Sequence, residues 1–145
     1  MWKELTVDDN KLLSRYKEVM DLMDKFYTKY TAENYRRMLR RGDKGFYYSD
    51  GSLEYFMMFH WNEVRRQWKI QCVGFTGSSD SVSVADLGFE FVKKFMADNS
   101  VQLYAVRPNV MDNNLINKHH DRWIEKQETV IEALKENDTV CQFRL

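Results

Sequence analysis

Proline, cysteine and long apolar runs are all scarce in this sequence. The chain has one proline and two cysteines. Cys72 and Cys141 lie in apolar, strand-like surroundings and are too few for a disulfide framework, so we expect free thiols in a reducing compartment. No apolar run approaches about 18 residues, which excludes a predicted membrane-spanning helix. The first ten residues, MWKELTVDDN, have no signal-peptide core, and we expect a cytoplasmic protein.

An excess of charge of either sign is also absent. The 22 basic residues are balanced by 22 acidic ones. This balance argues against nucleic-acid binding through bulk charge, although a local basic patch is compatible with it. Hydrophobic residues make up 43% of the chain and aromatic residues 14%, a composition typical of an ordered globular protein. The length predicts a single domain over residues 1–145.

Helical periodicity dominates the first forty residues. After a short strand at Trp2–Leu5, Thr6 and Asp9 form a capping-box-like start to a helix. Thr31 is placed to cap a second, shorter helix, and Gly42 suits its C-terminal end. The first helix is expected to carry one continuous apolar stripe, made of Leu12, Tyr16, Val19, Met20, Met23, Phe26, Tyr27 and Tyr30.

The second helix is locally basic. Its positive residues are Arg36, Arg37, Arg40, Arg41 and the following Lys44. The simpler interpretation is a solvated face whose cations are favoured near the helix C-terminus by the helix dipole. The functional alternative is a patch that binds phosphate or an acidic partner.

From Gly45 the apolar period changes to two. Gly45–Tyr48 and Leu53–Trp61 are predicted to form a hairpin around the turn at Ser49–Ser52, and Gln67–Gly74 is predicted as a third antiparallel strand. His60 stands alone in this pattern, because no second metal-type ligand follows at a recognisable spacing. We therefore interpret His60 as structural.

A strand–helix alternation is predicted for the second half. Val84–Met96 has the clearest helical stripe in the chain, with Ser83 and Asp86 as its N-cap pair. Val101–Val106 is predicted as a strand and Leu115–Gln127 as a helix, with Ile116, His119 or His120, Trp123 and Ile124 toward the core.

The C-terminal region has two interpretations. The β-branched run Thr129, Val130, Ile131 favours a last hairpin made of Thr129–Leu134 and Thr139–Leu145. The competing interpretation is one long helix from Leu115 to Glu136.

The predicted fold class is α/β (α+β), with a mixed, mostly antiparallel central sheet and helices on both faces. The element order is β-α-α-β-β-β-α-β-α-β-β. This order resembles that of the GNAT superfamily of N-acetyltransferases over essentially the whole chain. Two fragments also look like the small GNAT-like proteins of short-tailed phages: Gln71-Cys72-Val73-Gly74-Phe75-Thr76 before a long amphipathic helix, and Asn117-x-x-His120-x-Arg122-Trp123-Ile124.

The resemblance implies a phage-encoded N-acetyltransferase-like protein that uses acetyl-CoA and acts on an amine. It implies His120 and Tyr104 as catalytic candidates, because His120 is one of two groups on its helix that titrate near neutrality. No metal is expected. The implied cofactor residues are Cys72, Val73, Gly74, Phe75, Thr76, Gly77, Ser78, Ser79, Ser81, Val82, Ser83 and Asn117.

One departure from the family separates two functional hypotheses. The family's pyrophosphate loop has the pattern Gln/Arg-x-x-Gly-x-Gly/Ala, whereas the span Gly77–Ser83 has one glycine, no Arg or Gln, and Asp80. The second hypothesis is therefore a non-catalytic GNAT-fold phage protein that acts in virion assembly or binds a host protein. Its contact surface would be the basic second helix or aromatics around Trp61 and Trp68. A cystatin- or NTF2-like cone fits the first half of the chain and ranks last.

Overall fold

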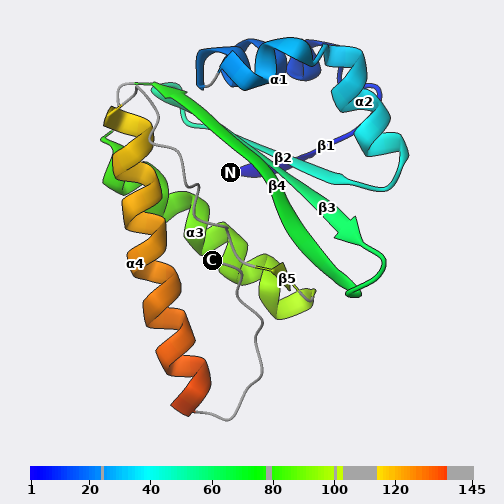
Figure 1. Cartoon of the computed structure of the whole chain (residues 1–145). Coiled ribbons are helices and arrows are strands. Elements are labelled where there is room, and N and C mark those ends of the chain that lie inside the picture. Colours follow the sequence, from blue (N-terminus) through cyan, green and yellow to red (C-terminus); the bar gives the residue numbers. More distant parts are fainter. Residues whose placement is uncertain (24, 78–79, 100, 103–113, 137–145) are drawn as a thin grey trace. The chain divides into compact units, whose positions relative to one another are not determined.

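The computed structural model describes residues 1–23, 25–77, 80–99, 101–102 and 114–136 (Figure 1). These residues form a mixed α+β fold. The chain divides into two compact units, and each is described by itself. Unit 1 comprises Met1–Trp61 and Ile70–Ser79, and unit 2 comprises Asn62–Lys69 and Asp80–Leu145.

Unit 1 is built on an antiparallel meander in the strand order β1-β2-β3-β4. The strands are β1 (Trp2–Leu5), β2 (Lys44–Ser49), β3 (Leu53–Asn62) and the part of β4 (Gln67–Gly77) that starts at Ile70. Trp2 pairs with Tyr48 across β1 and β2, and Lys44 pairs with Phe59 across β2 and β3. The predicted hairpin and third strand are confirmed, and β4 extends three residues beyond the predicted Gly74.

The helices of unit 1 are α1 (Asn10–Met23), a 3-10 turn η1 (Lys25–Lys29) and α2 (Ala32–Arg40). Figure 1 shows α1 and α2 over the same face of the sheet. The prediction of one apolar stripe reaching Tyr30 is wrong, because α1 ends at Met23. The core between helices and sheet contains Leu5, Leu13, Tyr16, Val19, Met20, Tyr27, Tyr35, Phe56, Met58 and Cys72.

The start of α2 follows directly from local chemistry. Thr31 is its N-cap, and the capping box with Asn34 satisfies two backbone N–H groups reciprocally. Past the last turn, Gly42 has φ +102° and its N–H donates to the carbonyl of Leu39. Both predicted boundaries of this helix are confirmed.

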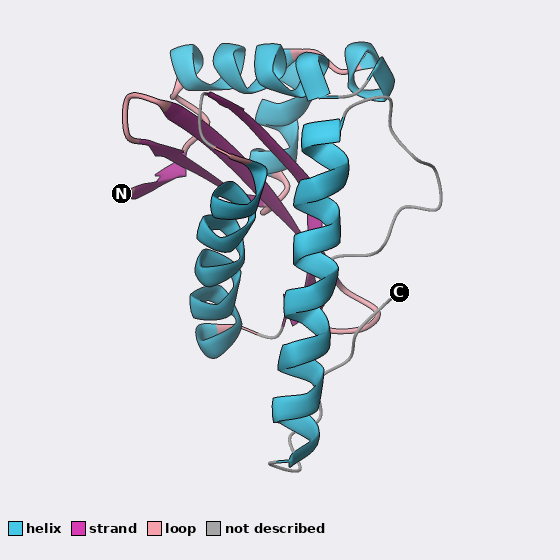
Figure 2. Cartoon of the chain, turned by 90° about the vertical axis from the view of Figure 1, so that its left-hand side faces the viewer, coloured by secondary structure: helices cyan, strands magenta, loops and turns pink. Residues whose placement is uncertain are grey.

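Unit 2 pairs the first residues of β4 with a short parallel strand, β5 (Val101–Gln102). Its helices, α3 (Ser81–Asp98) and α4 (Asn114–Glu136), lie side by side (Figure 2). Val84, Val92 and Phe95 of the predicted apolar stripe are buried, and Ala85 and Phe89 on one side of that stripe are buried as well.

The predicted strand Thr129–Leu134 is wrong. Helix α4 continues through it to Glu136, as the long-helix alternative anticipated. The Thr129 hydroxyl donates to the carbonyl of Glu125 one turn earlier, which accommodates this β-branched residue inside a helix. Residues 103–106 of the predicted fifth strand and the predicted strand Thr139–Leu145 lie outside the described residues. None of the described helices combines the length and apolarity needed to cross a membrane.

Candidate functional site

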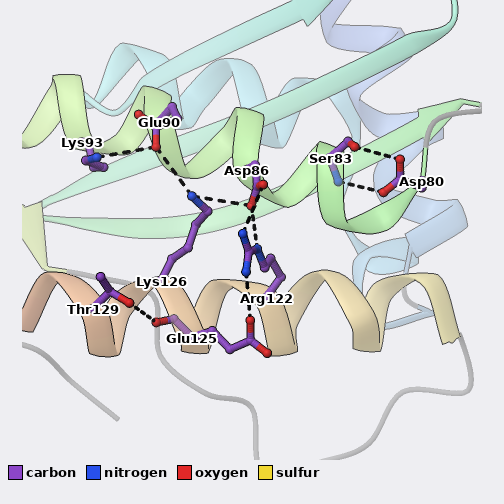
Figure 3. A network of polar contacts seen from close by, with 9 residues as sticks. All are labelled: Asp80, Ser83, Asp86, Glu90, Lys93, Arg122, Glu125, Lys126 and Thr129. Carbon is purple, nitrogen blue, oxygen red and sulfur yellow. Dashed lines mark hydrogen bonds and ion pairs between the residues drawn. The ribbon is translucent and has the colours of Figure 1, made fainter.

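The N-terminus of α3, where the sequence predicted a phosphate-binding loop, carries a carboxylate of its own. Asp80 is the N-cap: its carboxylate accepts hydrogen bonds from the backbone N–H of Ser83 at 2.9 Å and from the Ser83 hydroxyl at 2.8 Å (Figure 3). The prediction that Ser83 itself caps the helix is therefore wrong by three residues. The Ser83 N–H stabilises the charged form and lowers the pKa of Asp80 below its usual value.

Two of the predicted cofactor residues on β4 belong to the core of unit 1. The Cys72 thiol is buried and hydrogen-bonds the hydroxyl of Tyr16. Gly74 lies beneath α1, and a Cβ added to it would stand 2.5 Å from the sulfur of Met20. The face of β4 that carries these two residues is thus covered by α1, and side chains of unit 1 fill the space beside it.

The remaining described β4 residues are also packed to differing degrees. Phe75 stacks on Tyr55, with ring centroids 6.0 Å apart and an interplanar angle of 12°. Val73 and Thr76 are half-buried. Gly77 is exposed at φ +150°, and a Cβ there would stand 2.1 Å from a backbone oxygen of the β2–β3 turn. A glycine is therefore required at position 77, because the backbone of the β2–β3 turn lies too close to leave room for a side chain.

The predicted site residues divide between the two units. Cys72–Gly77 belong to unit 1, whereas Ser81–Ser83, Asn117 and His120 belong to unit 2. Asn117 and His120 are half-buried on α4, and Val82 and Ser83 are exposed at the start of α3. Ser78, Ser79 and the catalytic candidate Tyr104 lie outside the described residues.

The two histidines of α4 are perturbed by burial. His119 is 2% exposed, and its ring stacks on Trp123 at a centroid distance of 5.5 Å. Burial lowers the pKa of His119 to about 3. Burial also lowers the pKa of His120 to about 4, against a smaller opposing effect of Asp121. Both imidazoles are therefore neutral at pH 7, and His120 is a weak base there.

A polar network joins α3 to α4 (Figure 3). Asp86 accepts a hydrogen bond from Arg122 Nε at 2.8 Å and lies 3.6 Å from Lys126 Nζ, which is also 3.6 Å from Glu90. The hydrogen bond from Arg122 lowers the pKa of Asp86. Asp86 pairs with Arg122, and Glu90, one turn later on α3, pairs with Lys126, one turn later on α4. The two helices therefore run in the same direction.

Sequence reasoning missed one pair of ionisable residues in unit 1. The Asp43 side chain is 2% exposed, and its carboxylate lies 2.7 Å from His60 Nδ1 and 3.3 Å from an Arg41 guanidinium nitrogen. The signal that could have found this pair is the hairpin register: Lys44 pairs with Phe59, so the preceding and following residues are cross-strand neighbours.

The arginines in and just after α2 differ in their contacts with the rest of unit 1 and in their exposure. Arg36 donates to the carbonyl of Val7 at 2.9 Å and also bonds Asn10 and Glu33, so it ties α2 to the start of α1. Arg40 and Arg41 are exposed. Arg37 is exposed too, and among the described residues it has no ion pair. Three arginines along and just beyond this helix are therefore exposed.

Within the described part of the chain, no group of three or more His, Cys, Asp or Glu side chains is placed to hold a metal ion. Comparison of the chain with protein-family models, with curated proteins and with solved structures finds no match.

Proposed function

We propose that this chain is a non-catalytic binding protein on a GNAT-like scaffold, and that its partner is a viral or host protein. The observation that carries the proposal is the Asp80 carboxylate at the N-terminus of α3. A helix N-terminus attracts an anion because its first N–H groups have no partner within the helix. In α3 one of those N–H groups already donates to the Asp80 carboxylate, and the positive end of the helix dipole already stabilises its negative charge.

The residues of this helix terminus do not fit a pyrophosphate. A phosphate charge about 4 Å from Asp80 would be repelled by about 1 kcal/mol in water and by more when desolvated. On the strand side, Cys72 and Gly74 are engaged with α1. We therefore derive no catalytic step through CoA. The imidazoles of α4, buried for His119 and half-buried for His120, are neutral and do not exchange protons near pH 7.

Isothermal titration calorimetry with acetyl-CoA tests the proposal. We expect no heat of binding and no rise in melting temperature for the wild-type chain at millimolar acetyl-CoA. The variant Asp80→Ser retains a capping hydroxyl and removes the negative charge. It is therefore the matched control for repulsion between the Asp80 carboxylate and the phosphates of acetyl-CoA. Saturable binding by the wild-type chain would overturn the proposal.

The partner is tested separately by pull-down with the intact chain. A binding protein keeps its complex when His120 and Tyr104 are each replaced by alanine. Loss of a measurable acetylation activity in either variant would contradict a non-catalytic role.

An acyl-CoA-dependent N-acyltransferase is the second candidate. The observation in its favour is the parallel pairing of β4 with β5 across the intervening α3, which agrees with the GNAT-like order. It predicts that acetyl-CoA raises the melting temperature and that an amine is acetylated. The calorimetric experiment distinguishes the two candidates.

A further inference from the structure

We infer that the exposed arginines at the C-terminal half of α2 bind an acidic segment of the partner protein. This inference rests on the proposed function and names the chemistry of the partner. The surface consists of Arg37, Arg40 and Arg41, and we call it the arginine surface. Arg36 is excluded from it, because Arg36 is committed to contacts with the start of α1.

The arginine surface retains positive charge that its neighbours do not cancel. Arg40 lies 3.3 Å from Glu33, but the same carboxylate is bonded to Arg36. Arg41 lies 3.3 Å from Asp43, whose other oxygen is held by His60. Among the described residues, two carboxylates form ion pairs with three of the four arginines, and Arg37 forms none.

The side chains have the spacing and the exposure that recognition of a carboxylate requires. Arg37 and Arg41 are four residues apart, so they stand one above the other on one face, about 6 Å apart at Cβ. The side chains of Arg40 and Arg41 are 58% and 61% exposed. Two like charges at this spacing repel each other, and a carboxylate bound between them relieves that repulsion through bidentate hydrogen bonds.

A protein segment fits this surface better than a nucleic acid does. The chain as a whole has no net positive charge, so it has no long-range field that would attract a phosphate backbone. The described helix of nine residues is about 14 Å long, which matches about four residues of an extended peptide. The alternative aromatic surface is less available, because Trp68 is half-buried and its ring packs edge-on against Phe95.

Fluorescence anisotropy with a labelled polyglutamate peptide of about eight residues tests the inference. We expect saturable binding by the full chain that weakens at least about tenfold in Arg37→Glu/Arg41→Glu and weakens as salt rises. Arg37→Gln/Arg41→Gln, which perturbs the fold less, is expected to show a smaller loss in the same direction. Circular dichroism verifies that both variants are folded.

The matched control reverses two exposed lysines in unit 2. Lys94→Glu/Lys118→Glu changes the net charge by the same amount, and both side chains are exposed. This control is expected to bind the peptide like the wild-type chain. Equal losses in the two charge-reversed variants, absence of peptide binding at low salt, or tighter binding of a single-stranded oligonucleotide would overturn the inference. None of these results depends on acetyl-CoA, so failure here leaves the calorimetric test of the proposed function independent.

Discussion

The buried imidazole of His119 makes a quantitative prediction about acid stability. The folded state holds His119 neutral, with a pKa of about 3, whereas the unfolded chain takes up its proton near the ordinary value of about 6.5. The unfolded state therefore binds more protons below pH 6.5. The stabilisation is complete above that pH and is lost progressively as the pH falls toward the folded pKa. Between pH 7 and pH 5 this one group lowers the free energy of unfolding by about 2 kcal/mol.

Urea unfolding followed by tryptophan fluorescence at pH 7 and pH 5 measures this loss. His119→Gln removes the titrating group, and the wild-type chain is expected to lose about 2 kcal/mol more than this variant does over the same interval. Asp86 does not titrate in this interval, because the hydrogen bond from Arg122 keeps the pKa of Asp86 below its usual value. Identical pH dependence in both chains, or an imidazole resonance of His119 that titrates near pH 6.5 in the folded protein, would refute the reasoning.

Three further changes test the packing. Gly77→Ala is expected to destabilise unit 1 by more than Gly51→Ala does. Both glycines have positive φ, but of the two only Gly77 lies close to another backbone segment. Chemical denaturation should show free energies of unfolding that differ by at least about 1 kcal/mol between the two variants. Tyr16→Phe removes the hydroxyl that bonds the buried Cys72 and is expected to cost about 1 kcal/mol in the same assay. Trp123→Ala, at a fully buried position, is expected to cost about 3–5 kcal/mol, and a loss under 1 kcal/mol would contradict the packing described.

The parts of the fold that local chemistry specifies could be predicted from the sequence. Thr31 and Asn34 build the start of α2 from their own side chains, and the Asp50 carboxylate accepts from the backbone N–H groups of Ser52 and Leu53 in the β2–β3 turn. Each motif involves residues at most three positions apart. Such contacts are visible in the sequence because they depend on little else.

The errors fall where tertiary packing decides. The β-branched residues from Thr129 to Ile131 favour a strand, but α4 propagates through them from the segment that buries His119 and Trp123. The N-cap of α3 was predicted at Ser83, whereas Asp80 caps the helix; both side chains suit an N-cap, and the backbone geometry distinguishes them.

The surroundings of the candidate site residues could not be predicted from the sequence. Gly74 lies beneath Met20, which is 54 positions away in the sequence. Asp43 and His60 carry no motif, and their pairing emerges only when the hairpin register is known. A cross-strand pair of this kind has no sequence spacing that identifies it.

The hydrogen bond between Cys72 and Tyr16 gives unit 1 an internal chemical reporter. A thiol reacts with an alkylating reagent as a thiolate that the solvent reaches, and Cys72 is covered by α1 in the folded state. The alkylation rate of Cys72, measured in a Cys141→Ser background, therefore reports the frequency of local opening between α1 and the sheet. A slower alkylation of Cys72 in the presence of a partner would show that binding at α2 reduces the local opening of the neighbouring helix α1.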